Sequence, residues 1–519
     1  MSIERVLEEP CRLSDSVAWD IQRRFFQTFG PGAWADGIVP YYVTTNAYVA
    51  KCYARLIVAW VEDILDIDAD HGAAAIDPDE PIYVIELGAG TGRLSFLLSH
   101  ELAILSQERK LPSFRVVGTD FAEANIARWP DHPDLRQAFA EGRLDGAMFD
   151  ADLPGPLKLV HARETLGPAP VRNPLIAILN YVVDSLRQDA FLVNGRQLHE
   201  ITVQALMPAG STRDELAPDA TVELEMRRGS RPVRLPYYDD PSLDALLARY
   251  VDTLEHAEVL IPVGAIRALR FLRSLAGGRL CVVAGDKGFR GAKDLEGRRL
   301  GGLVKNGGFS FMANFDAIRS DLGGVSLTHD NRYSRFTVAS FSTVDGPFPR
   351  FRGAFREHIN EFGPAEYHRL FKLARASWQD PPVPMILLVL RLSSFDPTVF
   401  SLWSDRILNS IGSVSGAIRN DIGLCLDQVL ARTYAVSPKE DIRFSVGRVY
   451  YRLGRYSDAG KQFSRVVADT PERSVAWYNL GLCDEHVGRR REAHDHFQRA
   501  IQLDPSHAQA RAALERVSV

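Results

Sequence analysis

The most informative hydrophobic pattern lies in residues 82–98. A short apolar run from Ile82 to Ile85 has the length of a buried strand, and apolar residues at helical spacing begin at Leu94. Between these two segments stands Glu86-Leu87-Gly88-Ala89-Gly90-Thr91-Gly92. Glycines at alternate positions allow positive φ angles and let a ligand approach the main chain. The pattern predicts a strand, a glycine turn and a helix, with a small molecule bound at the turn.

The spacing of the glycines distinguishes among nucleotide-binding motifs. A dinucleotide fingerprint needs a third glycine where Arg93 stands, and no Gly-Lys-Ser/Thr of a P-loop follows. The remaining pattern resembles the first motif of class I S-adenosylmethionine (SAM) methyltransferases. This resemblance implies a Rossmann-like fold with SAM bound by four residues, namely Glu86, Gly88, Gly90 and Gly92. The alternative is a Rossmann-like fold that binds another ligand or none.

A second strand is predicted over residues 114–120, and it ends in Asp120. In dinucleotide folds an acidic residue at this position accepts hydrogen bonds from ribose hydroxyls, and the same geometry suits the ribose of SAM. We therefore predict that Asp120 binds the ribose. Its alternative role is to cap the following helix.

Strands and helices alternate from Ile82 to about Gln204, as in a doubly wound parallel sheet. Further strands are predicted over residues 146–152, 175–180, 190–193, 280–284 and 333–341. Ligands of such sheets bind beyond the carboxyl ends of the strands. We therefore expect Asp150, Asp152 and Asn180 in one crevice with the glycine turn, Asp150 at the adenine amine and Asn180 at the substrate.

Residues 1–80 are predicted to be helical, with an aromatic turn and an amphipathic helix from Tyr48 to Leu65. The Tyr/Thr/Asn cluster at residues 41–46 suggests a lid over the nucleotide fold, and aromatic core packing is the alternative. We assign residues 81–390 to a methyltransferase domain with insertions. Residues 391–519 form a helical domain in this scheme.

A 34-residue repeat starts at Glu440 and again at Ser474. Its paired positions are Gly447 with Gly481, Ala459 with Ala493, Phe463 with Phe497, and Pro471 with Pro505. This is the period of tetratricopeptide repeats, which present a groove for a protein or peptide partner. The sequence therefore predicts an all-α repeat domain, with helices from about 396 to 435 stacked on it and residues 508–517 as a cap.

Composition narrows the function further. The net charge is -5 without a basic stripe, which does not favour nucleic acid as a partner. The five cysteines are scattered without a Cys-x-x-Cys pair, which is typical of reduced thiols and excludes the usual zinc-ligand spacing. The longest apolar stretch, Met385 to Leu390, is too short to span a bilayer, and no secretory signal is recognisable. We expect a cytoplasmic protein without a metal site.

Beyond the glycine motif, residues 20–345 resemble the MidA-like methyltransferases. The resemblance rests on these stretches: 180–186 (the family's Asn-Glu-Phe-Phe-Asp-Ala-Leu), 198–200 (Trp-x-Glu), 261–265 (the Ser-Pro helix), 283–288 (Ile-Asp-Tyr-Gly, placing Asp286 on its Asp) and 313–315 (Val-Asp-Phe). Mitochondrial members of this family assist respiratory complex I assembly by methylating an arginine. The resemblance implies a SAM-dependent methyltransferase.

Two departures bear on the acceptor. Tyr181 stands where the family has Glu, and Arg187-Gln188 replaces its Pro-Val. A guanidinium must be gripped by carboxylates before it can attack a methyl group. Asn180, Asp184 and Glu200 are the residues predicted to hold or deprotonate the acceptor, and structural roles are their alternative.

We expect the acceptor to be a protein side chain recruited by the repeats, with arginine as one possibility. Two alternatives are an inactive scaffold acting through its repeats and a small-molecule methyltransferase. The glycines and Asp120 favour a live cofactor site, whereas Tyr181 favours the scaffold.

Overall fold

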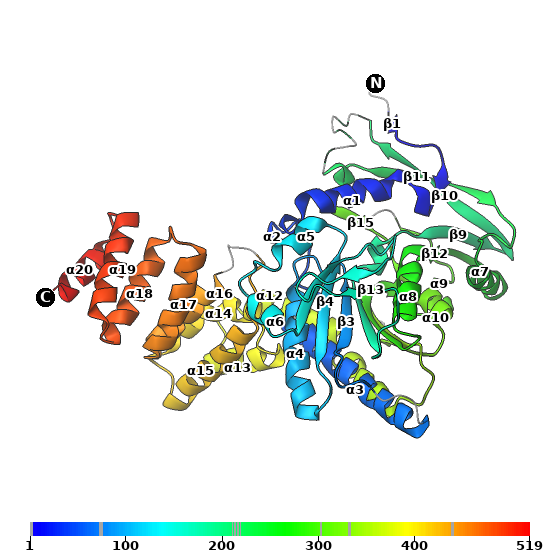
Figure 1. Ribbon diagram of the computed structural model, residues 1–519. Coiled ribbons are helices and arrows are strands. Elements are labelled where there is room, and N and C mark those ends of the chain that lie inside the picture. The colour runs from blue at the N-terminus through cyan, green and yellow to red at the C-terminus, as the bar shows by residue number, and fades with distance from the viewer. Residues whose placement is uncertain are drawn as a thin grey trace. The chain divides into compact units, whose positions relative to one another are not determined.

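The computed structural model describes residues 4–71, 76–209, 211, 214, 217, 219–301, 304–330, 334–436 and 441–518. The chain forms two compact units, Met1–His368 and Arg369–Val519 (Figure 1). The change of unit falls between His368 and Arg369, and the domain bounds at residues 80 and 390 stay predictions. Two predicted starting points, Tyr333 for a strand and Glu440 for a repeat, lie outside the described residues.

An eight-stranded sheet forms the centre of the first unit. Seven strands follow one another in the order β17-β18-β13-β8-β3-β4-β5, and β16 pairs with β13. Their bounds are β3 Ile82–Leu87, β4 Phe114–Asp120, β5 Leu144–Met148, β8 Leu175–Asn180, β13 Leu280–Phe289, β16 Ala313–Asn314, β17 Val325–Thr328 and β18 Phe336–Ser342. The five strands β5, β4, β3, β8 and β13 are parallel, while β18 runs antiparallel to both β13 and β17.

The strand order reverses at β3, which lies between β4 and β8. Such a switch point opens a crevice beyond the carboxyl ends of the parallel strands, and the glycine turn follows β3 directly. Numbered by position in the chain, the seven strands have the order 3-2-1-4-5-7-6 with the seventh antiparallel. The first unit thus has the Rossmann-like sheet of class I methyltransferases, as the sequence predicted.

Helices cover both faces of this sheet. Tyr83, Ile85 and Leu87 of β3 share a core with α8 (Val263–Leu275) and α10 (Phe315–Leu322). The alternate residue Glu86 bonds to Ser95 of α4 (Arg93–Arg109), so α4 covers the opposite face. The long helix α3 (Ala47–His71) packs against α4 and α11 (Pro349–Phe355). The remaining short elements near the sheet are α5 Glu123–Arg128, α6 Arg136–Ala140, β6 Leu157–Lys158, β7 Thr165–Leu166 and η4 Arg356–Glu361.

A second, antiparallel sheet corrects the strand assignment for residues 190–193. The strand β9 (Asp189–Asn194) does not join the central sheet but pairs with β10 and β12. The physical reason is the two-residue turn of Gly195 (φ 54°) and Arg196 (φ 65°) between β9 and β10: both residues have positive φ, as a tight hairpin turn requires. Its other strands are β1 Arg5–Val6, β2 Cys11–Arg12, β10 Gln197–Met207, β11 Glu225–Pro232 and β12 His256–Ile261.

The N-terminal helix α1 (Val17–Phe29) lies between the second sheet and the crevice. Its apolar residues Ala18, Trp19 and Ile21 pack with strands β9 and β10 in one core. On the other face of this sheet lies α7 (Pro241–Thr253), with α8 and α9 (Ala292–Leu295). The remaining elements near α1 are η1 Leu13–Asp15, α2 Gly32–Ala35, η2 Val183–Ser185, η3 Ala220–Val222, β14 Val304–Asn306 and β15 Gly308–Ser310.

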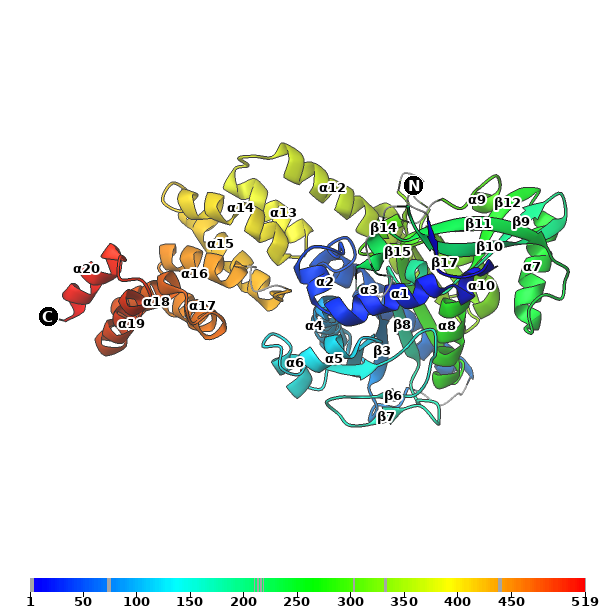
Figure 2. The ribbon, with the colours of Figure 1, turned by 90° about the horizontal axis from the view of Figure 1, so that it is seen from above.

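The second unit is a succession of helices that follow one another in a row (Figures 1 and 2). They are α13 Val383–Leu392, α14 Pro397–Ser410, α15 Gly416–Ala431, α16 Ile442–Arg452, α17 Tyr456–Asp469, α18 Ser474–His486, α19 Arg490–Leu503 and α20 Ala508–Val517, while α12 Pro364–Ser377 crosses the boundary. The repeated glycines have a packing reason. A Cβ at Gly447 would lie 2.9 Å from Phe463, and one at Gly481 would lie 2.6 Å from Phe497. The predicted all-α repeat domain is confirmed.

Candidate cofactor and acceptor site

A cavity of about 400 Å³ lies beyond the carboxyl ends of the parallel strands, in the size range of small-molecule sites. The residues expected at the site that line it are Glu86, Gly88, Gly90, Asp120, Asp150, Asp152, Asn180 and Asp184. Aromatic side chains form much of its wall, among them Trp19, Phe26, Trp34, Phe121 and Phe309. The cavity joins the sheet, α1 and residues 34–45, so segments far apart in the sequence build one site.

The glycine turn adopts the conformation that its sequence requires. Gly88, Gly90 and Gly92 have φ angles of 63°, 54° and 80°, which L side chains rarely adopt. Gly92 is the N-cap of α4 rather than part of the cavity wall. A Cβ at Gly88 would come within 2.9 Å of Val182, and one at Gly90 within 2.9 Å of Trp34. Close packing of the protein itself therefore demands these two glycines, in addition to any approach by a ligand.

Asp120 holds the glycine turn in place. Its carboxylate accepts hydrogen bonds from the backbone N–H of Gly90 at 3.0 Å and of Ala122 at 2.9 Å. The side chain is buried, and this burial raises the pKa of the carboxyl group above its usual value. Asp120 thus links the turn after β3 to the end of β4 while it lines the cavity.

Glu86 is buried at the start of the turn and accepts a hydrogen bond from the hydroxyl of Ser95. Burial raises the pKa of Glu86 from 4.5 to about 8, and the bond from Ser95 opposes the rise only in part. Near neutral pH this carboxyl group therefore carries a proton in most molecules.

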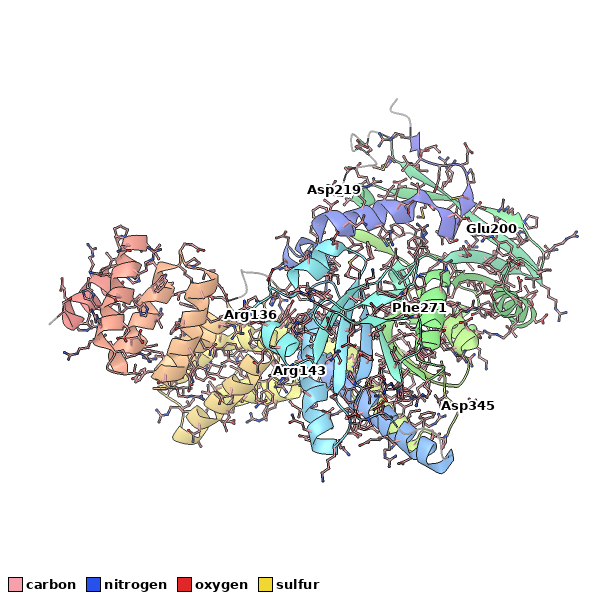
Figure 3. The ribbon with its side chains drawn as sticks, viewed as in Figure 1. Arg136, Arg143, Glu200, Asp219, Phe271 and Asp345 are labelled. Carbon is pink, nitrogen blue, oxygen red and sulfur yellow. The ribbon has the colours of Figure 1, made fainter. Side chains whose placement is uncertain are left out.

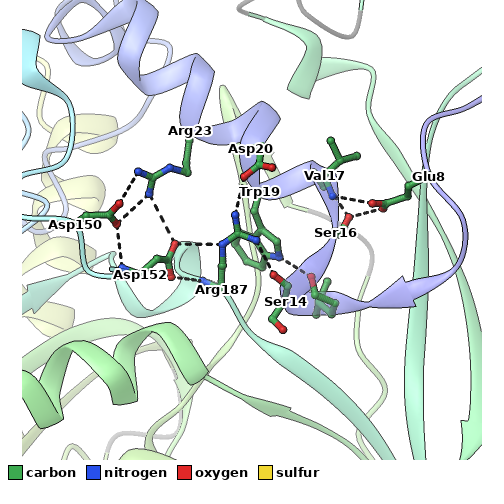
Figure 4. Close-up of polar contacts among 12 residues, drawn as sticks. Glu8, Ser14, Ser16, Val17, Trp19, Asp20, Arg23, Asp150, Asp152 and Arg187 are labelled. Carbon is green, nitrogen blue, oxygen red and sulfur yellow. Dashed lines mark hydrogen bonds and ion pairs between the residues drawn. The ribbon is translucent and has the colours of Figure 1, made fainter. Parts of the chain in front are cut away.

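Asp150 is engaged with α1 (Figure 4). Arg23 donates from Nη1 to one oxygen of Asp150 at 3.0 Å and from Nη2 to the other at 2.7 Å. The Arg23 guanidinium also lies 4.5 Å from the centre of the Phe121 ring. Both oxygens of Asp150 therefore face an arginine, so the adenine contact that the sequence suggested competes with an existing bidentate pair.

Arg187, one of the departures from the family pattern, connects the same region to the N-terminal segment. It donates to the backbone oxygen of Ser14 at 2.6 Å and pairs with Asp20 at 2.6 Å (Figure 4). Its Nε lies 3.7 Å from Asp152. Arg187 thus holds the start of α1 against the loop that follows β5.

Asn180 ends β8 and is used structurally. Its side-chain oxygen accepts a hydrogen bond from the Tyr53 hydroxyl at 2.9 Å, and its amide donates to the backbone oxygen of Thr44 at 3.2 Å. The next residue, Tyr181, has φ of 50°, an unusual conformation for a bulky residue. Its ring stacks on Phe336 with centroids 5.8 Å apart. Tyr181, which stands where the MidA-like methyltransferases have Glu, thus lines the cavity.

Two buried carboxyl groups and a lysine meet at the ends of β8 and β13. The Asp286 carboxyl group accepts a hydrogen bond from the backbone N–H of Asp184 at 3.0 Å. Lys287 Nζ lies 3.3 Å from Oδ2 of Asp184. Burial raises the pKa of Asp286 well above its usual range, and the negative charge of the neighbouring Asp184 adds a smaller rise. Both effects favour the neutral form of Asp286. Burial also raises the pKa of Asp184, against the opposing influence of Lys287.

Glu200 does not line the cavity. It lies on β10 in the second sheet (Figure 3), buried, and accepts a hydrogen bond from Arg231 Nε at 2.6 Å. Arg12 Nε lies 3.7 Å from its other oxygen. The structure therefore does not bring Glu200 together with Asn180 and Asp184, and its carboxylate instead joins strands β2, β10 and β11.

Sequence reasoning missed several residues that line the cavity, notably Arg23, Trp34, Lys287 and Ser310. Lys287 follows Asp286 just beyond the strand predicted over residues 280–284. The strand pattern therefore already indicated that Lys287 lies near the crevice. For Arg23, Trp34 and Ser310 no sequence signal was available, because tertiary packing of α1, α2 and β15 brings them to the site.

Part of the chain matches a known family. A model described as a tetratricopeptide repeat matches residues 474–507. No curated protein matches the sequence. Among solved structures, an uncharacterized COG1565 superfamily protein from Burkholderia thailandensis has 16% identity and a TM-score of 0.38, covering 66% of this chain and 90% of that one.

A second COG1565 superfamily member from Burkholderia thailandensis, described as a candidate methyltransferase and bound to S-adenosylhomocysteine, has 16% identity and a TM-score of 0.35, covering 65% of this chain and 95% of that one. The structure of MamA has 16% identity and a TM-score of 0.20, covering 32% of this chain and 79% of that one. Within the described part of the chain, every helix is too short or too polar to cross a bilayer.

Proposed function

We propose that this protein is a SAM-dependent methyltransferase whose cofactor binds in the cavity at the glycine turn. The observation that carries the proposal is the position of the turn: it follows β3 at the switch point of the sheet and is bonded to Asp120 at the end of β4. This is where sheets of this kind bind nucleotides.

The residues around the cavity fit such a ligand. The turn of Gly88 and Gly90 leaves backbone exposed to the cavity, and the acceptor lone pairs of Asp120 not used by two backbone N–H groups suit ribose hydroxyls. Phe121 and Phe149 supply apolar surface for a base. SAM, when bound, supplies a methyl group activated by the sulfonium. The protein's own part is to position the acceptor and to exclude water.

The repeats of the second unit support a role in recruiting a protein, because stacked tetratricopeptide helices form a surface that binds peptides. We therefore infer that the methyl acceptor is carried by a protein partner. A small-molecule acceptor and an inactive scaffold are the competing functions. The scaffold is disfavoured by the glycine turn and Asp120, which keep the arrangement that a bound nucleotide needs.

Titration calorimetry of the full chain with SAM tests the proposal. We expect binding, and we expect Asp120→Ala to weaken it by about tenfold or more, since hydrogen bonds to a charged group contribute roughly 1.5 to 3 kcal/mol. Asp131→Asn, an exposed carboxylate change in the same unit, is the matched control and should leave the affinity unchanged.

Absence of SAM binding to the folded wild-type chain would refute the proposal. A loss of less than about twofold in Asp120→Ala would show that Asp120 only holds the turn.

A further inference from the structure

The carboxyl groups of the cavity all bond to other groups of the protein. Among the described residues that line it, five carry carboxyl groups, and each has a partner: Glu86 with Ser95, Asp120 with Gly90 and Ala122, Asp150 with Arg23, Asp152 with Arg187, and Asp184 with Ser185 and Lys287. The wall thus has several carboxyl groups and several positive charges beside them. Because the proposed function assigns the remaining capacity of Asp120 to the cofactor ribose, the described wall lacks a carboxylate left over for the methyl acceptor.

Two consequences follow for the methyl acceptor. A cationic acceptor such as a guanidinium would have to displace the cation that pairs with Asp150, Asp152 or Asp184 to gain a counter-ion, and removing the partner of a buried charge is costly. An acceptor that must lose a proton before it attacks needs a free base, and the candidate for that role, Asp184, already binds the Ser185 hydroxyl at 2.7 Å and the Lys287 ammonium at 3.3 Å. The wall suits neither kind of acceptor.

Lys287 offers the opposite charge. Its Nζ lies 3.0 Å from the hydroxyl of Ser310 and 5.8 Å from the Tyr181 ring, and its side chain is 23% exposed where it lines the cavity. The other cation of the described wall, Arg23, is bound by both oxygens of Asp150. An ammonium has three N–H donors, and the contacts of Lys287 with Ser310 and Asp184 in the described part of the chain leave one for a ligand.

We propose that the acceptor is a carboxylate, held by Lys287 and Ser310 and methylated on oxygen, an inference that rests on the proposed function. A carboxylate is already deprotonated near neutral pH, so it needs no base. One carboxylate oxygen forms a bond to the methyl carbon as the carbon–sulfur bond breaks, and the electron pair of that bond stays on sulfur. The products are a neutral methyl ester and a neutral thioether, and no proton is transferred.

The carboxylate acceptor can belong to an acidic side chain of a protein or to a free organic acid. Two probes separate them. The peptide acetyl-Gly-Glu-Gly-amide represents an acidic side chain, and benzoate represents a free acid that could use the aromatic wall of Trp19 and Phe309. The peptides acetyl-Gly-Gln-Gly-amide and acetyl-Gly-Arg-Gly-amide are the neutral and cationic counterparts.

The experiment measures binding of each probe to the full chain by saturation-transfer NMR, in the presence of S-adenosylhomocysteine. We expect at least one of the two carboxylate probes to bind about tenfold more tightly than the Gln and Arg peptides, which corresponds to one charge-assisted contact. Lys287→Met should remove that preference, while Lys287→Arg should retain part of it. Calorimetry with SAM is run on each variant, and we expect its affinity to stay within about twofold of wild type.

A second measurement follows the product. Tritium from labelled SAM should appear on the preferred carboxylate probe and be released as volatile methanol by mild alkali, as a methyl ester requires. Preferential binding of the Arg or Gln peptide, equal binding of all four probes, no binding of any of them, or label that resists alkali would overturn the carboxylate assignment. Calorimetry of the wild-type chain with SAM tests the proposed function on its own. If the wild-type chain does not bind SAM, the proposed function fails, whatever the four probes show. The wild-type comparison remains decisive if Lys287→Met fails to fold.

Discussion

The backbone N–H of Gly90 donates a hydrogen bond to Oδ2 of Asp120 at 3.0 Å. This contact joins two neighbouring strands of the sheet at their carboxyl ends, 30 residues apart in the chain. The residue proposed to bind the ribose is therefore also the residue that fixes the turn proposed to accommodate the rest of the cofactor. Cofactor affinity and the local stability of the turn should depend on each other.

Gly90 should be intolerant of a side chain even without a ligand. Gly90→Ala places a Cβ 2.9 Å from the Trp34 ring at φ of 54°. We expect a loss of about 2 kcal/mol or more in the free energy of unfolding, from the left-handed backbone and from crowding. In a Trp34→Ala background only the backbone cost of about 1 to 2 kcal/mol should remain.

Urea unfolding of the four proteins in this cycle measures the coupling between Gly90 and Trp34. We expect a coupling of about 1 kcal/mol. Equal costs of Gly90→Ala with and without Trp34 would show that the two residues are energetically independent.

Glu86 should make stability depend on pH in a predictable direction. Its pKa rises from 4.5 to about 8 on folding, so the folded state keeps a proton that the unfolded state loses between these values. The wild-type chain should therefore lose stability relative to Glu86→Gln as pH rises from 4.5 to 8, at up to about 1.4 kcal/mol per pH unit, with no further change above that window.

Urea unfolding of wild type and Glu86→Gln at pH 5, 6.5 and 8.5 measures this difference, and Glu123→Gln on the exposed start of α5 serves as control. A difference that does not vary with pH would mean that Glu86 is ionised in the folded protein.

The Arg23–Asp150 pair should hold α1 over the cavity. Arg23→Ala removes both hydrogen bonds of a half-buried bidentate pair, which contribute roughly 1.5 kcal/mol, and leaves Asp150 without that partner. We expect amide hydrogen exchange in residues 17–29 to become about tenfold faster.

Gln27→Ala, on the exposed side of the same helix, is the control and should leave exchange unchanged. Unaltered exchange in Arg23→Ala would show that the apolar contacts of Trp19 and Ile21 alone hold α1 in place.

Two glycines of the second unit should respond in opposite directions to the same substitution. Gly481→Ala puts a Cβ 2.6 Å from the buried Phe497, and overpacking costs about 1 to 3 kcal/mol. Gly460→Ala puts a Cβ at an ordinary 3.5 Å from Cys483, so the gain in helix propensity of up to about 1 kcal/mol should prevail.

Hydrogen exchange of the α17 and α18 amides in the full chain reports both changes, as less protection in Gly481→Ala and more in Gly460→Ala. Stabilisation by both substitutions would show that Phe497 moves aside without cost.

The sequence by itself determined the elements whose signals are local. The strand from Ile82, the glycine turn, the strand ending in Asp120 and the 34-residue repeat follow from side-chain periodicity and backbone preferences over a few neighbouring residues. Even the hairpin that places β9 in another sheet has a local signal, the glycine at the first position of its Gly195-Arg196 turn.

Only the tertiary structure decided which side chains are left to act on a ligand. Nothing near Asp150 or Asn180 in the sequence shows that one is held by Arg23 and the other by Tyr53 and Thr44. A carboxylate or amide has the same appearance in a sequence whether its hydrogen-bonding capacity is spent or free. Its partners come from segments more than a hundred residues away, and only packing of the chain brings them within bonding distance.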